Sequence, residues 1–483
     1  MPQPLKDLQP KAIWKHFMLL NAIPRASKKE AQVIQFMKAF GENLGLETVM
    51  DNTGNLLIKK PATPGKESHD TVILQGHLDM VHQKNEDTIF DFATQGIDMY
   101  VDGDWVKAKG TTLGADNGIG VAAIMTVLAT EDIVHPPIEA IFTIDEEIGM
   151  TGAMGLQKDF LSGSILLNLD SEEDDALTVG SAGGVDVHVR CKYESEELSA
   201  DYSFYELIVN GLTGGHSGVD IHKGLSNAIK LTNRILYILN KEFSLRVAEI
   251  HGGDLTNAIP RECQALIAIQ NSEINYAKEV LEKSTALLKK ENKFSDPDLK
   301  ITLHASAKKT LVLSKEFQSK LLASLYSAPN GIYRMTPSLN NLVQSSNNLA
   351  KIKLENQELL ISCHTRSFIE SERDDLVSAI SSSFTLLDAI VEKDGSYPGW
   401  NPDPNTKIVK TMKQVYKNLH GNEPDIFAIH AGLECGILSE IYPHLDIISF
   451  GPNITGAHSP DEALQISSTQ KFWKYLTAVL AQL

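Results

Sequence analysis

The chain is organised around the stretch Gln75-Gly76-His77-Leu78-Asp79-Met80-Val81. It follows Thr71-Val72-Ile73-Leu74, a β-branched and apolar run that predicts a buried strand. In an extended chain, side chains two positions apart point the same way, so His77 and Asp79 face one site. An imidazole beside a carboxylate is a common way to orient a metal ligand. A hydrogen-bonded polar pair at a strand end is the simpler interpretation, so the rest of the chain must supply partners.

The composition narrows the class of protein. The 483 residues are too many for one ordinary core, which predicts two domains. The formal net charge of −18 disfavours a nucleic acid or a membrane surface as partner; it suits a metal, a cationic substrate or plain solubility. The four cysteines are scattered without a CxxC motif, which favours a reducing compartment. Without an apolar signal segment or a run of membrane-spanning length, a cytoplasmic protein is expected.

Acidic residues stand at the ends of several later apolar segments. Asp116 comes just before a buried helix expected over 119–130, where a plain N-cap is the alternative role. Asp145-Glu146-Glu147 follows an expected strand, and a solvated loop is the alternative there. Asp170 ends another apolar run. In an open α/β sheet, sites form where the carboxyl ends of strands meet, so we expect these acids to gather.

The composition and the pattern of expected elements change at two places, the glycine-rich stretch near 184 and the proline-rich stretch after 397. They predict an α/β catalytic domain formed by 1–184 and 398–483, with a mostly parallel central sheet and flanking helices. An α+β domain over 185–397 is inserted into it. Within the insertion, the polar stretch 330–347 is expected to be a loop. Helices are expected over 225–239, 274–291, 315–327 and 370–391.

The residues expected at the strand ends form a set with metal chemistry. They are His77, Asp79, Asp116, Glu146, Glu147, Asp170 and His458. Two imidazoles and three carboxylates suit zinc, cobalt or manganese. If one carboxylate bridges, five ligands serve two metals and leave room for a shared water, as in two-metal hydrolases. A free carboxylate is then needed as general base. Adjacent side chains diverge, so one of Glu146 and Glu147 binds metal while the other faces the water.

Six short stretches carry a resemblance to a known family. In chain order they are Gly76-His77-Leu78-Asp79, Gly114-Ala115-Asp116-Asn117-Gly118, Asp145-Glu146-Glu147-Ile148-Gly149, Asp170-Ser171, Gly215-His216-Ser217-Gly218 and Gly456-Ala457-His458-Ser459. Together they resemble the motifs of the di-zinc exopeptidase family that holds carnosinases, aminoacylases and peptidase T. Within it, three longer stretches are most similar to the branch of bacterial aminoacyl-histidine (Xaa-His) dipeptidases. They are Leu113 to Gly118, Asn168 to Glu173 and His430 to Glu434.

The resemblance implies a catalytic site with two zinc ions, or cobalt or manganese in their place. The ligands would be His77, Asp116 and Asp170 for one ion and Asp116, Glu147 and His458 for the other. Asp79 would orient His77, and Glu146 would be the general base that acts on the water between the ions. The Asp116–Asn117 peptide bond would be cis. Many relatives carry Asp where this chain has Asn117, which removes a negative charge near the metals and bears on metal preference.

The resemblance also implies that the inserted domain is a lid and dimerisation domain that holds substrate. His216 would help to stabilise the oxyanion, and Arg366 would pair with the dipeptide carboxylate. From the residues alone, the simpler interpretations are a turn residue for His216 and a surface salt bridge for Arg366. Asn257 would grip the substrate. His430 and Glu434 would lie near it, with Glu434 meeting its amino group.

The implied function is that of a zinc-dependent cytosolic dipeptidase that acts as a homodimer. It would hydrolyse unblocked dipeptides, especially Xaa-His such as β-alanyl-histidine (carnosine). A tripeptide aminopeptidase or an N-acyl amino acid deacylase would use the same site, so both remain alternatives. An alternative from another class is a metal-binding or interaction module without catalysis. Glu146 argues against that module, because such a relative could lose the base and keep the ligands.

Overall fold

In the computed structural model, which describes residues 4–308 and 310–483, the apolar run before His77 forms strand β3 (Val72–His77). It pairs in parallel with β6 (Ile138–Thr143) on one side and β7 (Ile165–Asn168) on the other. Every residue of these three strands is buried. Strands covered on both faces are apolar along their whole length, which explains the uniform runs in the sequence. The carboxyl ends of three neighbouring strands therefore lie at one edge of the sheet.

The chain forms two compact units. The first comprises the described residues up to Gly180 together with Pro402–Ala428 and Leu433–Leu483. The second comprises Ser181–Asn401 and the short piece Ile429–Gly432. The second unit is thus an insertion in the sequence of the first, and the sequence placed this insertion at 185–397.

The central sheet of the first unit is mixed, with eight strands in the order β1-β2-β6-β3-β7-β21-β8-β20. The remaining strands are β1 (Glu47–Met50), β2 (Leu56–Lys60), β21 (Asp446–Ser449), β8 (Ala176–Ser181) and β20 (Asp425–Ile429). The four central strands β6, β3, β7 and β21 are parallel, whereas β1, β2 and β8 join by antiparallel pairs. The α/β fold predicted from the sequence is confirmed; the sheet is mixed, with parallel central strands and antiparallel pairs on both sides of them.

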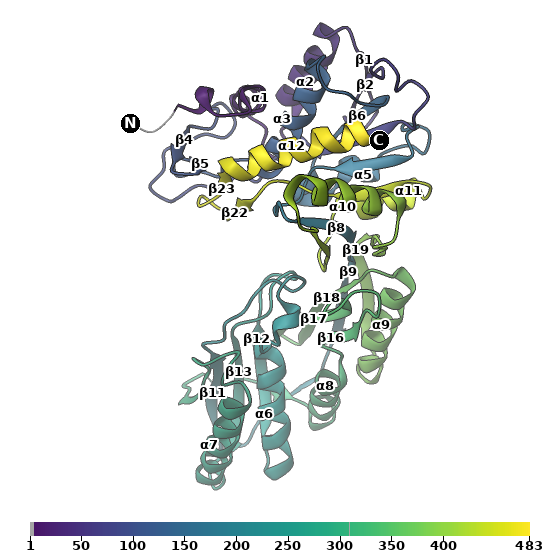
Figure 1. Ribbon diagram of the computed structural model, residues 1–483. Helices are drawn as coiled ribbons and strands as arrows, with labels where there is room; N and C mark the ends of the chain where they lie inside the picture. Colours follow the sequence, from purple (N-terminus) through teal and green to yellow (C-terminus); the bar gives the residue numbers. More distant parts are fainter. Residues whose placement is uncertain (1–3, 309) are drawn as a thin grey trace. The chain divides into compact units, whose positions relative to one another are not determined.

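Helices flank this sheet (Figure 1). Helix α3 (Ala115–Ala129) packs on β3 and is buried at nearly every position, as its apolar sequence predicts. Helix α1 (Lys11–Asn21) packs on α3, and α2 (Ala31–Asn43) packs on β1 and β2. The other helices of this unit are η1 (Leu5–Asp7), α4 (Glu146–Gly149), α5 (Thr151–Met154), α10 (Lys407–His420), α11 (Glu434–Ile441) and α12 (Ile466–Gln482). A small sheet, β22-β23-β5-β4, comprises β22 (Ile454–Thr455), β23 (Ala463–Gln465), β5 (Trp105–Ala108) and β4 (Met99–Asp102).

The second unit is built on a nine-stranded sheet in the order β14-β11-β13-β12-β17-β18-β9-β19, with β16 paired to β17. All the strand pairs recorded in it are antiparallel. The strands are β9 (Gly183–Lys192), β11 (Tyr202–Asn210), β12 (Arg246–Gly252), β13 (Cys263–Gln270), β14 (Lys300–Ala305), β16 (Gly331–Met335), β17 (Val343–Glu355), β18 (Glu358–Ser367) and β19 (Ile390–Tyr397). Strands β10 (Ser195–Glu196) and β15 (Val312–Leu313) form a separate short pair.

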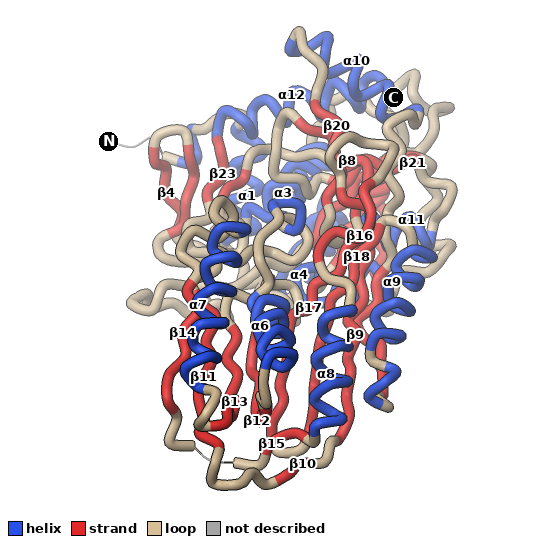
Figure 2. Tube along the Cα trace, turned by 90° about the horizontal axis from the view of Figure 1, so that it is seen from below, coloured by secondary structure: helices blue, strands red, loops and turns tan. Residues whose placement is uncertain are grey.

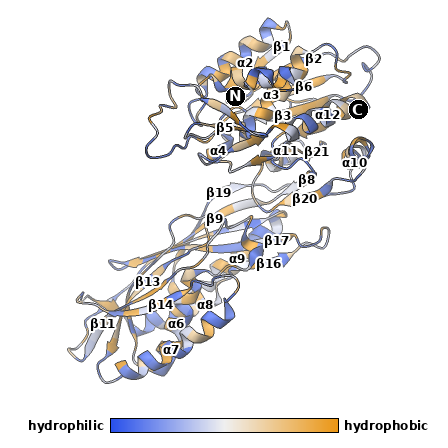
Figure 3. Cartoon of the chain, turned by 60° about the vertical axis from the view of Figure 1, so that its left-hand side comes forward, coloured by the Kyte–Doolittle hydropathy of each residue, from blue (hydrophilic) through white to orange (hydrophobic). Residues whose placement is uncertain are grey.

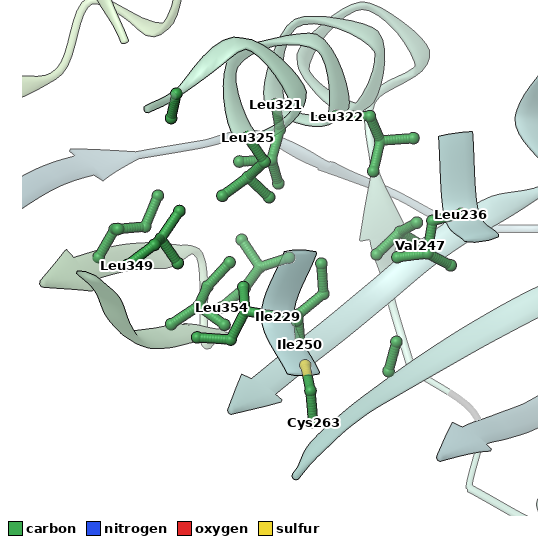
Figure 4. Packing of buried hydrophobic residues seen from close by; sticks show 14 of the residues in the cluster. Ile229, Leu236, Val247, Ile250, Cys263, Leu321, Leu322, Leu325, Leu349 and Leu354 are labelled. Carbon is green, nitrogen blue, oxygen red and sulfur yellow. The ribbon is translucent and has the colours of Figure 1, made fainter. Parts of the chain in front are cut away.

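Four helices cover one face of this sheet (Figure 2). They are α6 (Ala228–Glu242), α7 (Ile274–Glu291), α8 (Lys315–Ser327) and α9 (Glu370–Ser383), and the short turns η2 (Ile221–Lys223) and η3 (Thr385–Leu387) complete the unit. Strands and helices of this unit both carry apolar and polar stretches (Figure 3). The core lies between the two layers. Figure 4 shows part of it, where α6 and α8 meet β12, β13 and β17 through Ile229, Leu236, Val247, Ile250, Cys263, Leu321, Leu322, Leu325, Leu349 and Leu354.

Two sequence predictions in this unit are wrong. The stretch 330–347 is not a loop, because it contains β16 and the start of β17. In β17 the polar side chains from Gln344 to Asn348 are buried and bonded inside the unit: Asn347 donates to the Pro329 carbonyl and Asn348 to the Ala258 carbonyl, both at 2.7 Å. A rule that assigns polar residues to solvent misses such strands. The helix expected over 370–391 ends at Ser383, and the left-handed conformation of Asp388 (φ 51°) turns the chain towards β19.

Among the residues that the structure describes, no helix combines the length and apolar character needed to cross a bilayer.

The core of the second unit yields a stability prediction. Leu354 is fully buried among Ile229, Ile250 and their neighbours, so Leu354→Ala leaves a cavity there. We expect it to lower the free energy of unfolding by about 2–5 kcal/mol, measured by urea denaturation. Leu287→Ala, at a side chain that is 57% exposed on α7, is the matched control and should change stability by less than about 0.5 kcal/mol. Equal effects of the two substitutions would contradict the assignment of this core.

Candidate metal centre

The predicted residues of the first unit converge at the carboxyl edge of the parallel strands. His77 ends β3, Glu146 and Glu147 follow β6 in the short helix α4, and Asp170 follows β7. Asp116 lies in the first turn of α3. His458 comes from the loop between β22 and β23, with a left-handed backbone (φ 64°). Segments far apart in the sequence thus deliver imidazoles and carboxylates to one place.

Asp116 stands between the two imidazoles. One carboxylate oxygen of Asp116 lies 3.0 Å from His77 Nε2, and the other lies 3.2 Å from His458 Nε2. His77 Nε2 is also 3.4 Å from Asp170, and His458 Nε2 is 3.0 Å from Glu147. The carboxylate of Asp116 therefore belongs to two clusters at once, one on each side of it.

Three groups of side chains are arranged closely enough to hold a metal ion. They are His77–Asp116–Asp170, Asp116–Glu147–His458 and His77–Glu146–Glu147, and within each group the potential ligand atoms lie within 4.8 Å of one another. The first two groups are the two ligand sets implied by the sequence, and they share Asp116. The third group places Glu146 close to His77 of the first group and to Glu147 of the second. All seven strand-end residues predicted from the sequence are brought together, including Asp79, described next.

Asp79 lies behind His77 and is fully buried. One of its oxygens is 3.4 Å from His77 Nδ1. The carboxylate also accepts hydrogen bonds from the Ser27 hydroxyl (2.8 Å) and from the backbone amides of Glu146 (3.0 Å) and Glu147 (3.3 Å). Burial alone would raise the pKa of Asp79, but these neighbours hold it at about 2. Asp79 therefore remains a carboxylate, and it joins the His77 loop to the Glu146–Glu147 loop.

The charges of this cluster fit a bound cation. Burial and negative neighbours raise the pKa of Glu146 well above its usual range and raise the pKa of Asp170 to about 6. Buried carboxylates at such close quarters repel one another unless a positive charge joins them. The carboxylate oxygens and imidazole nitrogens of this cluster are the ligand atoms that zinc and similar divalent metals prefer. The residues present therefore fit a pair of divalent ions that share Asp116.

The Asp116–Asn117 peptide bond is cis, which confirms the prediction. The Asn117 side chain is buried and donates a hydrogen bond to the Leu169 carbonyl at 2.6 Å. A Cβ atom on Gly76 would lie 2.4 Å from the Asn117 amide oxygen, so the glycine makes room for it. Asn117 thus ties the start of α3 to the residue before Asp170. Its effect on metal preference stays a prediction.

Glu434 begins α11 in the first unit and is 1% exposed. One of its oxygens accepts hydrogen bonds from Gln75 Nε2 (2.7 Å) and the Thr143 hydroxyl (2.6 Å), and the other has no partner among the described residues. Burial raises the pKa of Glu434 to about 8, opposed by the Thr143 hydrogen bond. Glu434 therefore lies against the ends of β3 and β6, with one oxygen available.

The other predicted substrate residues belong to the second unit. His216 Nδ1 accepts backbone hydrogen bonds from Gly218 (3.2 Å) and Val219 (3.0 Å), so in the neutral ring the proton lies on Nε2. The ring therefore has the turn role that the sequence offered as an alternative. Asn257 is exposed, and its carbonyl accepts a hydrogen bond from the Ser217 amide at 2.7 Å.

Arg366 and His430 lie close to the His216 loop. Arg366 is 4% exposed and donates to the Tyr397 hydroxyl at 2.8 Å, so it is not the surface salt bridge considered from the sequence. His430 Nε2 lies 2.8 Å from the Ser346 hydroxyl. A Cβ atom on Gly218 would lie 2.1 Å from the His430 carbonyl and 3.0 Å from Arg366 Nε. The glycine of the Gly215–Gly218 motif thus permits these two residues to pack against the loop.

Sequence reasoning missed two buried charged residues that contact the metal-binding loops, Arg25 and Glu462. Arg25 lies in the connection between α1 and α2, and Glu462 lies four residues after His458. Both are 2% exposed. Apart from the Asn21 side chain, which accepts from Arg25, their hydrogen-bond partners are backbone groups, which carry no residue-type signal. The one available signal is the occurrence of Arg25 directly after a proline between two apolar helices.

Comparison with known proteins assigns the chain to a family. The model of peptidase family M20/M25/M40 matches residues 73–482. The chain is 40% identical over 479 residues to the cytosol non-specific dipeptidase of Escherichia coli K12, covering 99% of both chains.

Solved structures give the same result. The crystal structure of an aminoacylhistidine dipeptidase from Vibrio alginolyticus superposes with a TM-score of 0.93 at 41% identity, covering 99% of this chain and 98% of that one. A tripeptidase from Staphylococcus aureus Mu50 has a TM-score of 0.58 at 16% identity over 98% of each chain. The second likeness shows a shared fold alone.

The environment of His430 yields a pH-dependent prediction. Burial, with Arg366, His216 and His364 nearby, lowers the pKa of His430 to about 3. In an unfolded chain it is about 6.5, so between these values the unfolded state binds one more proton and acid favours unfolding. We expect the free energy of unfolding to fall by about 1–2 kcal/mol from pH 7 to pH 5 on account of His430.

The measurement is urea denaturation at both pH values for the wild type and His430→Gln. The variant should lose that part of the acid sensitivity. His304→Gln, at an exposed position, is the control and should keep it. A wild type and a His430→Gln variant with the same pH slope would show that His430 titrates normally.

Proposed function

The chain belongs to peptidase family M20/M25/M40, and from this premise we propose that it is a dipeptidase that hydrolyses unblocked dipeptides with two bound divalent metal ions. The observation that carries the proposal is the position of Asp116, with a carboxylate oxygen 3.0 Å from one histidine and 3.2 Å from the other. Two ligand sets that share one carboxylate are the arrangement a two-metal hydrolase needs.

The residues have defined roles in this proposal. His77, Asp116 and Asp170 would hold one ion and Asp116, Glu147 and His458 the other, with zinc as the expected metal and cobalt or manganese as substitutes. When bound, such ions lower the pKa of a water and polarise the carbonyl of the scissile bond. Asp79 keeps the His77 ring in place through its contact at 3.4 Å.

Glu146 is the proton carrier. Its carboxylate accepts a proton from the water whose oxygen attacks the carbonyl carbon of the peptide bond. As the carbon–nitrogen bond breaks, the same carboxyl group returns the proton to the leaving amine nitrogen. The adjacent Glu147 serves instead as a ligand because its side chain reaches His458.

The two ends of the substrate would meet groups of complementary hydrogen-bonding chemistry. The free oxygen of Glu434 suits the amino group of the dipeptide, and the buried guanidinium of Arg366 suits its carboxylate. The Nε2–H of His216 suits the developing oxyanion, and Asn257 and His430 complete the contacts to substrate. These roles favour substrates with both ends free.

Two further features belong to the proposal. The preferred substrates are Xaa-His dipeptides, including β-alanyl-histidine, since a relative of 41% identity is an aminoacylhistidine dipeptidase. The chain acts in the cytoplasm as a homodimer through the second unit, which serves as lid and dimerisation domain. The cytoplasmic location is supported by the E. coli relative, a cytosol dipeptidase.

The role of Glu146 is tested by substitution. Glu146→Gln keeps the size of the side chain but cannot accept the proton, so kcat should fall by about 10²–10⁴-fold. Elemental analysis should still find about two metal ions per chain. Glu147→Gln, at the adjacent position, is the comparison and should lose metal. Loss of metal from Glu146→Gln, together with retention of metal by Glu147→Gln, would exchange the two roles and contradict the proposal.

Substrate choice is tested with a panel of carnosine, Gly-His, a tripeptide and an N-acetyl amino acid on metal-loaded protein. We expect hydrolysis of the two dipeptides at the highest kcat/KM, because an acetylated amine cannot pair with Glu434 and a longer peptide moves its carboxylate away from Arg366. Preferred hydrolysis of the N-acetyl compound would make the chain a deacylase. Preferred hydrolysis of the tripeptide would make it a tripeptidase.

A further inference from the structure

Glu462 binds the backbone of the segment that delivers Asp116. One carboxylate oxygen accepts hydrogen bonds from the amides of Leu113 (2.7 Å) and Gly114 (2.9 Å). The other accepts from Ala115 (2.7 Å) and Asp116 itself (3.2 Å). Four consecutive amides thus point at one buried carboxylate. Since Glu462 is four residues from His458, it joins the loops of two proposed ligands.

Arg25 binds the same segment from another direction. Its guanidinium donates to the carbonyls of Leu78 (3.1 Å) and Asp79 (2.9 Å) through Nη1. Through Nη2 it donates to the Asn21 side chain (3.0 Å) and to the Gly114 carbonyl (2.5 Å). The fixed fork of the guanidinium therefore sets the spacing between the chain after His77 and the chain before Asp116.

The glycines of the Asp116 motif make room for Arg25. A Cβ atom on Gly114 would lie 2.5 Å from Arg25 Nη2, and one on Gly118 would lie 2.6 Å from the same atom. Gly114 also has a left-handed backbone (φ 67°), which glycine adopts without strain. The two glycines that flank Asp116 in the sequence are thus explained by a guanidinium that comes from a distant segment.

From these contacts we propose that Arg25 and Glu462 are positioning residues for the metal centre, which set the distances between the loops of His77, Asp116 and His458. The proposal rests on the proposed two-metal function. Neither residue touches the reacting atoms or belongs to a ligand set. Each acts through the backbone, so a small displacement of the Asp116 loop would separate its carboxylate from both histidines at once.

A purely structural role makes a different prediction. If the two residues only hold the fold together, substitutions lower the stability of the metal-free and metal-loaded proteins alike. If they position ligands, substitutions also weaken metal binding. Because bound metal raises the unfolding temperature by an amount that grows with the logarithm of its affinity, the metal-induced rise in Tm separates the two roles.

The experiment compares Arg25→Lys and Glu462→Gln with the wild type, using purified full-length protein stripped of metal. Lys keeps the charge of Arg25 without the fork, and Gln keeps the size of Glu462 but turns an N–H₂ group towards two amide donors. Zinc affinity is measured by competition with a chelator, and Tm is measured with and without zinc. We expect each variant to bind zinc 10–100-fold more weakly and to show a smaller metal-induced rise in Tm.

Glu139→Gln is the matched control. Glu139 lies near the amino end of β6, is 3% exposed and accepts hydrogen bonds from the Ser162 amide (2.8 Å), the Ser162 hydroxyl (2.6 Å) and the Gly163 amide (3.0 Å). It is therefore a buried carboxylate that binds backbone amides of the same unit away from the metal centre. Its substitution should lower Tm equally with and without zinc and leave zinc affinity unchanged.

Two further measurements test the proposal independently of zinc binding by Arg25→Lys and Glu462→Gln. Gly118→Ala places a methyl group against Arg25 without removing any charge, so it should weaken zinc binding even if Glu462→Gln does not fold. Hydrogen exchange of the metal-free Glu462→Gln protein should show faster exchange at residues 113–116. Variants that bind zinc within twofold of the wild type would overturn the proposal. A wild type that binds no zinc would overturn the proposed function itself, and this assignment with it.

Discussion

The contacts of the Asp116 carboxylate with His77 Nε2 and His458 Nε2, at 3.0 and 3.2 Å, are the interaction on which the first unit depends. Mutually repelling carboxylates can share a buried place only if cations or hydrogen bonds offset their charge. The parallel strands β3, β6 and β7 bring these side chains together, because the carboxyl ends of the strands lie side by side. The buried carboxylate of Asp79 is stabilised by the hydrogen bonds that it accepts from the backbone amides of Glu146 and Glu147, directly after β6.

The second unit has a polar cluster of a different kind. Its polar cluster holds the guanidinium of Arg366 and the imidazoles of His216 and His430, whereas the first unit gathers carboxylates. The Tyr397 hydroxyl fixes one end of the guanidinium, and Gly184 leaves space for the Tyr397 ring.

The sequence predicted which side chains gather at the sheet edge because strand ends obey a simple rule. An apolar run followed by His or an acidic residue places that side chain at the sheet edge. This holds for His77, Glu146, Glu147 and Asp170. The rule fails where polar side chains are buried and paired with one another, as in β17. It also fails for Arg25 and Glu462, whose hydrogen bonds go mainly to backbone groups far away in sequence. Such partners appear only when the chain is folded.

The shared carboxylate of Asp116 is the central claim, and anomalous diffraction from crystals of the zinc-loaded protein tests it most directly. Two peaks are predicted. One should lie about 2.0–2.2 Å from ligand atoms of His77, Asp116 and Asp170, and the other at the same distance from Asp116, Glu147 and His458. A single peak, or two peaks that do not both contact Asp116, would contradict the account.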